Sequence, residues 1–203
     1  MARTAVDRFE QRKQTRQLLI DAALELFSKS GYEYATVDDI SNAAGFSKGA
    51  YYFHFSTKDD VLLELVRLWT ESRSAVLADA EDVRSRDDLK ATLMAFFAYD
   101  DEPRWPGALL EFWAQALRNN EVSKRLSQAY ASWRKQLAEA FARAGVAEGT
   151  AAEDAASVAL ASHDGFAVQV AIGSPAAKAI TAADLAESLV APAVQQAARR
   201  RAM

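Results

Sequence analysis

The chain contains 28 acidic residues, yet none of them lies between Asp39 and Asp59. Within this acid-free window the sequence SKGAYYFHFSTK brings together the basic groups of Lys48, His54 and Lys58 with the phenol of Tyr52. Such side chains donate hydrogen bonds to phosphate oxygens or to base edges, whereas a carboxylate would repel phosphate. The pattern therefore indicates a surface that faces a nucleic acid.

The aromatic residues of this window allow a second interpretation, in which they fill a small helical core. We expect core positions for Tyr51, Phe53 and Phe55. For Tyr52 and His54 we expect a mixed role, with the ring partly buried and its polar tip directed outward. The window thus combines core positions with an outward polar face.

The rest of the chain offers little for catalysis or metal binding. Ser162-His163-Asp164 contains the residue types of a catalytic triad, but consecutive residues on a helix point in different directions and are not expected to form a relay. No second histidine and no cysteine stands near His163 at metal-ligand spacing. We therefore expect neither an enzyme, nor a metal site, nor a cofactor.

Composition places the chain among cytoplasmic helical proteins. Half of its 203 residues are hydrophobic, so a sizeable core is available. Because the net charge is −4, the chain as a whole is not a polycation, and DNA binding would require a local patch without acids. The absence of cysteine fits a reducing compartment. The basic N-terminal sequence lacks the apolar run of a signal peptide, and no apolar stretch reaches the ~20 residues that span a bilayer.

Periodicity and capping signals predict an all-α fold. A first helix is expected from about Arg12 to Ser30, ended by Gly31. Two short helices should follow, joined through Gly45, and a much longer one should run from about Lys58 to Ala80. The predicted helix starts are Thr36 with Asp39, Ser47, and Ser56 or Thr57 with Asp59 or Asp60. Two short helices around a glycine are typical of a helix-turn-helix, whose second helix enters the major groove of DNA.

The remaining sequence predicts about six longer helices that are rich in tryptophan. We expect Thr150 with Glu153, and Thr181 with Asp184, to cap two of them. Pro192 should kink or shorten the last helix, and the arginines at 199–201 should form a solvated tail. The sequence thus divides into residues 1–57, a helix-turn-helix domain, and residues 58–203, a larger helical ligand-binding and dimerisation domain, with about nine helices in all.

The segment GYEYATVDDISNAAGFSKGAYYFHFSTKDDVLLELV resembles the N-terminal domain of the TetR family of bacterial transcriptional repressors across residues 15–66. The family pattern is a glycine, Thr-Val-x-x-Ile-Ala, Ala-Gly-Val-Ser-Lys-Gly, a tyrosine, an aromatic pair and a lysine before a long helix. Ser41 stands where the family usually has alanine, Phe46 where it usually has valine, and Tyr51 where leucine or isoleucine is common. Farther along, LLEFWAQALRNNEV and WRKQL look like one regulator subgroup.

The resemblance implies a homodimeric repressor that binds a palindromic operator and is released by a small inducer. It implies that Lys48, Gly49 and Ala50 face bases, that Tyr52, His54 and Lys58 hold phosphates, and that Thr36 contacts phosphate at a helix N-terminus. The expected DNA-binding set is Thr36, Ser47, Lys48, Gly49, Ala50, Tyr52, His54 and Lys58.

Aromatic residues on the inward stripes of several later helices suggest an apolar pocket for a lipophilic or aromatic inducer. Gln115, Asp164 and Gln169 are polar groups that can orient such a ligand. The alternative is plain core, with regulation by a protein partner in place of a ligand. The expected ligand-binding set is Trp69, Phe96, Phe97, Trp105, Phe112, Trp113, Tyr130, Trp133, His163 and Phe166.

We expect the last two long helices to form a homodimer contact, and the segment AASVALASHDGFAVQVAIG carries this prediction. Its apolar residues, among them Val158, Leu160, Phe166 and Ile172, fall on more than one face of a helix. A helix that is apolar nearly all round is buried on two sides, here against its own domain and against a second copy. The alternative is that the segment after Gly173 covers the second face.

Overall fold

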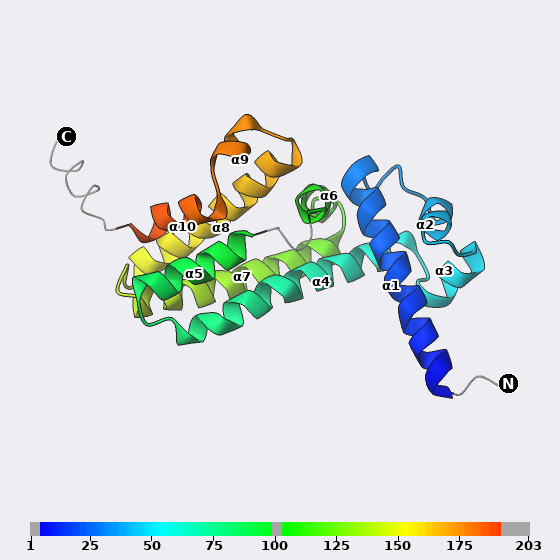
Figure 1. Ribbon diagram of the computed structural model, residues 1–203, viewed down its shortest axis with the longest axis horizontal. Coiled ribbons are helices and arrows are strands. Elements are labelled where there is room, and N and C mark those ends of the chain that lie inside the picture. The colour runs from blue at the N-terminus through cyan, green and yellow to red at the C-terminus, as the bar shows by residue number, and fades with distance from the viewer. Residues whose placement is uncertain (1–4, 99–102, 192–203) are drawn as a thin grey trace. The chain divides into compact units, whose positions relative to one another are not determined.

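The computed structural model describes residues 5–98 and 103–191, and within these ranges all regular structure is helical (Figure 1). The all-α prediction is therefore confirmed. The elements are α1 (Ala5–Ser30), α2 (Val37–Ala43), α3 (Lys48–His54), α4 (Lys58–Ala78), a 3-10 helix η1 (Asp79–Asp82), α5 (Arg86–Phe97), α6 (Trp105–Ala116), α7 (Asn120–Arg143), α8 (Thr150–Ala171), α9 (Pro175–Ala179) and α10 (Ala182–Val190).

The described residues form two compact units. The first unit consists of the residues up to Thr70 together with those from 103 to Leu126, so it holds α1 to α3, most of α4, and α6. The second unit consists of the residues from Glu71 to 98 and from Ser127 onward, and it holds α5, most of α7, and α8 to α10. The functional division after Thr57 stays a prediction.

Local signals set the ends of the N-terminal helices as the sequence predicts. Gly31 adopts a φ of 88°, which ends α1, and Gly45 adopts a φ of 75° in the turn between α2 and α3. Both angles are readily available only to glycine. The hydroxyl of Thr36 accepts from the Asp39 N–H at 3.1 Å, and the Asp39 carboxylate accepts from the Thr36 N–H at 2.9 Å, which completes a capping box.

The first unit is held together by α1. Ile20, Leu24 and Phe27 of α1 are buried in its core, together with apolar residues of α2, α3 and α4. Helix α6 approaches α1 so closely that a Cβ on Gly107 would lie 2.7 Å from the Ser28 carbonyl oxygen. A larger residue would fit this contact only if one of the two helices shifted.

In the second unit, α5 lies along α10. Arg86 of α5 donates to the carbonyl of Val190 at 2.8 Å, and Lys90 pairs with Glu187. The buried faces of α5 and α7 supply the core of this unit: Leu89, Leu93, Phe96, Phe97, Trp133, Leu137 and Phe141. Thr181 caps α10 through Asp184, as predicted.

Two helix starts differ from the predictions. Helix α1 begins by Ala5, well before Arg12. The stretch was missed because residues 8–14 are exposed and carry no apolar periodicity. Thr150 is not a cap: it is the first helical residue of α8, and Gly149, at a φ of 53°, precedes it as the N-cap without a side-chain hydrogen bond. The predictions for Pro192 and for 199–201 lie outside the described residues. In residues 5–98 and 103–191, no helix is both long and apolar enough to cross a membrane.

Candidate functional site

Helices α2 and α3 meet through the turn at Gly45. The N–H of Phe46 donates to the Ser41 carbonyl at 2.9 Å and closes the turn. Ser41 is buried where the two helices approach, and its hydroxyl donates to the Val37 carbonyl at 2.7 Å. A serine is therefore accommodated at this contact because its hydroxyl is satisfied within its own helix.

The aromatic residues of α3 divide between core and surface. Tyr51 is fully buried and its phenol donates to the Thr57 carbonyl at 2.9 Å, while Phe55 is 4% exposed. These two core predictions are confirmed. The core prediction for Phe53 is wrong, because Phe53 lies two residues after Tyr51, on the opposite face of α3, and is 63% exposed. Tyr52 is half exposed and His54 is partly exposed, as expected for mixed roles.

The outward face of α3 begins with Lys48, Gly49 and Ala50. Lys48 and Gly49 are exposed and Ala50 is partly exposed. The Lys48 ammonium forms an exposed ion pair with Asp38 of α2 at 3.1 Å, and this hydrogen bond raises the pKa of Lys48. Asp38 lies just outside the acid-free window, so the linear sequence gave no sign of the pair.

The side chains of Thr36, Ser47 and Lys58 already serve the fold. Thr36 closes the capping box of α2, and the Ser47 hydroxyl accepts from the Ala50 N–H at 3.3 Å. The Lys58 ammonium donates to the carbonyls of Tyr32 at 2.7 Å and Ala35 at 2.9 Å, and it lies 4.1 Å from the centre of the Tyr32 ring. Phosphate contacts by these three residues stay predictions, and each would come in addition to a structural role.

Helix α1 contributes two arginines that the sequence predictions did not include. The Arg12 guanidinium lies 5.1 Å from the centre of the Phe53 ring, and Arg16 lies 5.0 Å from that of Phe55. Burial and the nearby charges of Arg16 and Arg12 lower the pKa of His54, so the neutral imidazole is favoured. The only sequence signal for these contacts of Arg12 and Arg16 was the basic composition of the first helix. The N-terminal part of that helix carries no apolar stripe that would have shown which side packs on α3.

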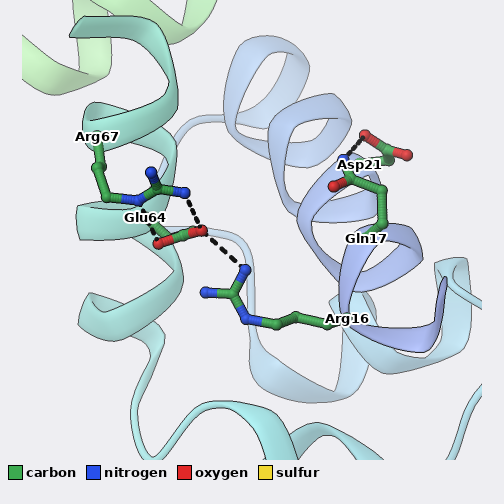
Figure 2. Close-up of polar contacts among 5 residues, drawn as sticks. All are labelled: Arg16, Gln17, Asp21, Glu64 and Arg67. Atoms are coloured by element: carbon green, nitrogen blue, oxygen red, sulfur yellow. Dashed lines mark hydrogen bonds and ion pairs between the residues drawn. The ribbon is translucent and has the colours of Figure 1, made fainter. Parts of the chain in front are cut away.

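Arg16 also connects α1 to α4. Figure 2 shows its guanidinium directed at Glu64, which it reaches at 2.8 Å, while Arg67 of α4 contacts both oxygens of the same carboxylate at 3.0 and 2.8 Å. The hydrogen bonds from Arg67 and then Arg16 lower the pKa of Glu64 to about 2, against the opposing effect of burial. Glu64 is therefore ionised across the physiological range and ties the two helices together.

The predicted ligand-binding residues are divided between the two units. Trp69, Trp105, Phe112 and Trp113 belong to the first, where the Phe112 ring lies 6.2 Å from those of both Trp69 and Trp105. The second unit holds Phe96, Phe97, Tyr130, Trp133, His163 and Phe166. The ten residues therefore do not all belong to one compact unit.

In the second unit, His163 is buried among aromatic rings. Its ring centre lies 4.9 Å from that of Phe96, which in turn lies 5.8 Å from that of Trp133. His163 Nδ1 lies 3.0 Å from an Asp164 oxygen, and the Tyr130 phenol donates to that oxygen at 2.8 Å. His163 and Asp164 therefore meet although they are neighbours on α8, so the expected divergence of side chains does not hold for this pair. The expectation that Ser162, His163 and Asp164 form no relay stays a prediction. Burial lowers the pKa of His163, although Asp164 opposes the effect.

Two surface hollows lie on other parts of the two units. One, of about 260 Å³, is lined by Arg8, Gln11, Arg12, Thr15, Phe46, Ala50, Phe53 and His54. The other, of about 450 Å³, is lined by Ala131, Arg134, Lys135, Ala138, Glu139, Ala142, Gly149, Ala152 and Glu153. None of the predicted ligand-binding residues lines either hollow. The described residues contain no group of three or more histidine and acidic side chains suited to a metal ion.

Two family models match the chain. The model of the bacterial regulatory proteins of the tetR family matches residues 19–65, which include α2 and α3. The model of the C-terminal domain of BetI-type transcriptional repressors matches residues 85–195, more than half of the chain. The chain belongs to the TetR family of bacterial transcriptional regulators. The TetR resemblance and the fold predicted from it, an N-terminal helix-turn-helix and a helical C-terminal part, are thereby confirmed.

Individual proteins with similar sequence or fold include three regulators. The HTH-type transcriptional repressor Rv1474c of Mycobacterium tuberculosis is 32% identical over 124 residues, which are 61% of this chain and 59% of that protein. A putative transcriptional regulator of Pseudomonas aeruginosa PAO1 has the same fold, with a TM-score of 0.72, 25% identity, and coverage of 93% of this chain and 94% of that one. A putative regulator of Saccharomonospora viridis, solved with choline, has a TM-score of 0.70 at 20% identity and covers 87% of this chain and 94% of its own. The chain spans about half of the length of the curated relatives it matches.

Proposed function

We propose that this TetR-family protein is a cytoplasmic repressor, not an enzyme, that binds a palindromic operator as a homodimer. We further propose that a small lipophilic or aromatic inducer releases it from DNA. The observation that carries the proposal is the exposed face of α3. It presents Lys48, Gly49 and Tyr52, and its Phe53 lies against Arg12 of α1.

The operator contact is proposed to be divided between bases and backbone. Lys48, Gly49 and Ala50 begin α3, and the small side chains of the last two let the helix approach base edges closely. Lys48 can exchange its exposed partner Asp38 for a base, since exposed ion pairs contribute little to stability. The proposed phosphate contacts come from Thr36, Ser47, Tyr52, His54 and Lys58.

The homodimer is proposed to form through α8 and α10. The buried face of α8 includes Leu160 and His163, while its opposite face carries Gly165 and exposes Val158 by 54%. The C-cap residue Ile172, directly after α8, is 67% exposed. A small and apolar stripe on the exposed side of a helix suits close contact with a symmetry-related copy. A two-fold axis also matches a palindrome, whose half-sites are read by two helices about 34–36 Å apart.

The inducer is proposed to bind the aromatic cluster of the second unit. Phe96, Phe97 and Trp133 provide apolar and aromatic surface, and the polar pair of His163 and Asp164 can orient a ligand. The choline found in the structure of the Saccharomonospora viridis protein supports small-molecule binding within this fold. The inducer must bind the DNA-incompetent form more tightly than the DNA-bound form, because equal affinity would shift nothing.

The competing function is a DNA-binding regulator controlled by a protein partner, without a small-molecule pocket. Tryptophan fluorescence distinguishes the two. Hydrophobic compounds, with choline in the same panel, should quench the emission of wild type more than that of Trp133→Phe, and the compounds that bind should also release DNA. Quenching without release means a pocket but no switch. If no compound of the panel quenches or releases, the partner-regulated function replaces the inducer.

The DNA-binding proposal itself is tested by titrating duplexes selected from random DNA. Lys48→Ala should reduce discrimination between the selected duplex and its single-base variants by about ten-fold or more. Lys58→Ala should weaken binding to all duplexes alike and flatten the salt dependence. If both variants bind as wild type does, the assignment of α3 and the start of α4 to DNA is wrong.

A further inference from the structure

Helices α1 and α3 together enclose a cationic hollow of about 260 Å³ that no sequence motif assigns. Four of its lining residues come from α1 and four from the turn and α3, and none of the eight is an acid. The charged groups at its wall are the guanidinium groups of Arg8 and Arg12, and the imidazole of His54 adds a polar group. A hollow of this composition suits a small anion or one group of a polyanion.

The charges of Arg8 and Arg12 are available to such an anion. Among the residues whose side chains are described, neither forms an ion pair, whereas Arg16, one turn farther along α1, is paired with Glu64. Arg12 is held over the Phe53 ring, which fixes its position without neutralising its charge. Phe53 thereby has a role that its exposed position on α3 leaves otherwise unexplained.

The hollow also lies on the proposed DNA side of the first unit, because Ala50, Phe53 and His54 of α3 form one of its walls. A helix in the major groove is flanked by the sugar-phosphate backbones that border the groove. An element that packs beside this helix on the DNA side can reach one of those backbones. Guanidinium groups suit phosphate well, because their planar N–H groups can donate in pairs to phosphate oxygens.

We infer that Arg8 and Arg12, with Phe53 as the residue that positions Arg12, form a further phosphate-binding site that extends the operator contact beyond α2 and α3. The inference rests on the proposed DNA binding and deepens it. It assigns to α1 a sequence-independent contact with the backbone outside the base pairs that α3 reads.

The test compares the double variant Arg8→Ala/Arg12→Ala with Lys13→Ala. Lys13 is an exposed cation next to Arg12 that does not line the hollow, so its loss changes the charge of α1 but not the site. Each lost phosphate contact should reduce the slope of log K against log salt concentration by about 0.9. The slope should therefore fall by about 2 per subunit in the double variant and by much less in Lys13→Ala. Phe53→Ala should reduce the slope by part of that amount, and Arg12→Lys should leave most of the wild-type slope in place.

A second measurement separates DNA contact from a structural role. Selected duplexes are trimmed in steps from both ends. Wild type should lose affinity once the flanking backbone is removed, whereas the double variant should be insensitive to the same trimming. Circular dichroism confirms that the variants are folded, and Lys48→Ala is measured in parallel.

The outcomes of these measurements are distinct. If wild type selects no duplex, the proposed DNA binding fails, and with it this inference. If wild type binds a selected duplex and Lys48→Ala impairs discrimination, but the double variant matches Lys13→Ala in slope and in trimming, only the inference about α1 is overturned.

Discussion

The carboxylate of Glu64 allows a quantitative test of how α1 is fixed to α4. Its pKa falls from an ordinary value of 4.5 to about 2, which corresponds to at most about 3 kcal/mol of stability at neutral pH. The Arg16 and Arg67 side chains are 39% and 40% exposed, so screening by water should reduce this to about 1–2 kcal/mol. Glu64→Gln should lower the free energy of unfolding by that amount, or the melting temperature by about 2–8 °C.

The pH dependence follows from the direction of the shift. Because the pKa of Glu64 is lower in the folded chain than in the unfolded chain, its contribution is fully present above about pH 5 and is lost as the pH falls toward 2. The difference in unfolding free energy between wild type and Glu64→Gln should therefore be constant near neutral pH and shrink in acid.

Urea unfolding at fixed protein concentration measures this difference, and Asp21→Asn is the matched control. Asp21 is also an acid at the α1 surface, but its partner is the neutral Gln17 amide, at 3.1 Å (Figure 2). The control should remain within about 0.5 kcal/mol of wild type. The reasoning is refuted if Glu64→Gln behaves like Asp21→Asn, or if its deficit does not change between neutral pH and pH 3.

Three further predictions concern other contacts. Gly107→Ala should cost about 1–3 kcal/mol in chemical unfolding, because the new methyl group would meet the Ser28 backbone; unchanged stability would mean that α1 and α6 separate easily. Asp38→Asn should tighten binding to random-sequence DNA at low salt, since it frees Lys48 and removes a carboxylate beside the interface; weaker binding would contradict the proposed position of α2. Val158→Asp should shift sedimentation at micromolar concentration toward the monomer, and an unchanged dimer would exclude the α8 stripe as its contact.

Local signals in the sequence were sufficient for several helix boundaries. Within the helix-turn-helix, the cap at Thr36, the turn at Gly45 and the burial of Tyr51 follow from chemistry within a few residues, and the structure agrees at each. The same holds for the cap of α10 at Thr181. The predicted cap at Thr150 was wrong because Gly149, just before it, is the N-cap of α8. Which of the two residues is the N-cap depends on the path of the preceding loop.

Contacts between distant segments were beyond the reach of sequence periodicity. The acid-free window did not reveal that Asp38 pairs with Lys48 from the neighbouring helix, nor that Lys58 binds two backbone carbonyls near Tyr32. The exposure of Phe53 follows from its position on α3, but its role under Arg12 depends on how α1 crosses that helix. The aromatic stripes were correctly placed on helices, but their division between two units was not visible in the sequence.

The measurement that tests the central claim most directly is a parallel selection of duplexes from random DNA by wild type and by Lys48→Ala. Wild type should enrich a palindrome whose half-sites lie about 10 base pairs apart, as two α3 helices on one side of DNA require. Lys48→Ala should lose enrichment at the same position in each half-site while still retaining DNA at low salt. If wild type enriches no sequence, or if both proteins enrich the same sequence to the same degree, then α3 does not read an operator through Lys48 and the account is contradicted.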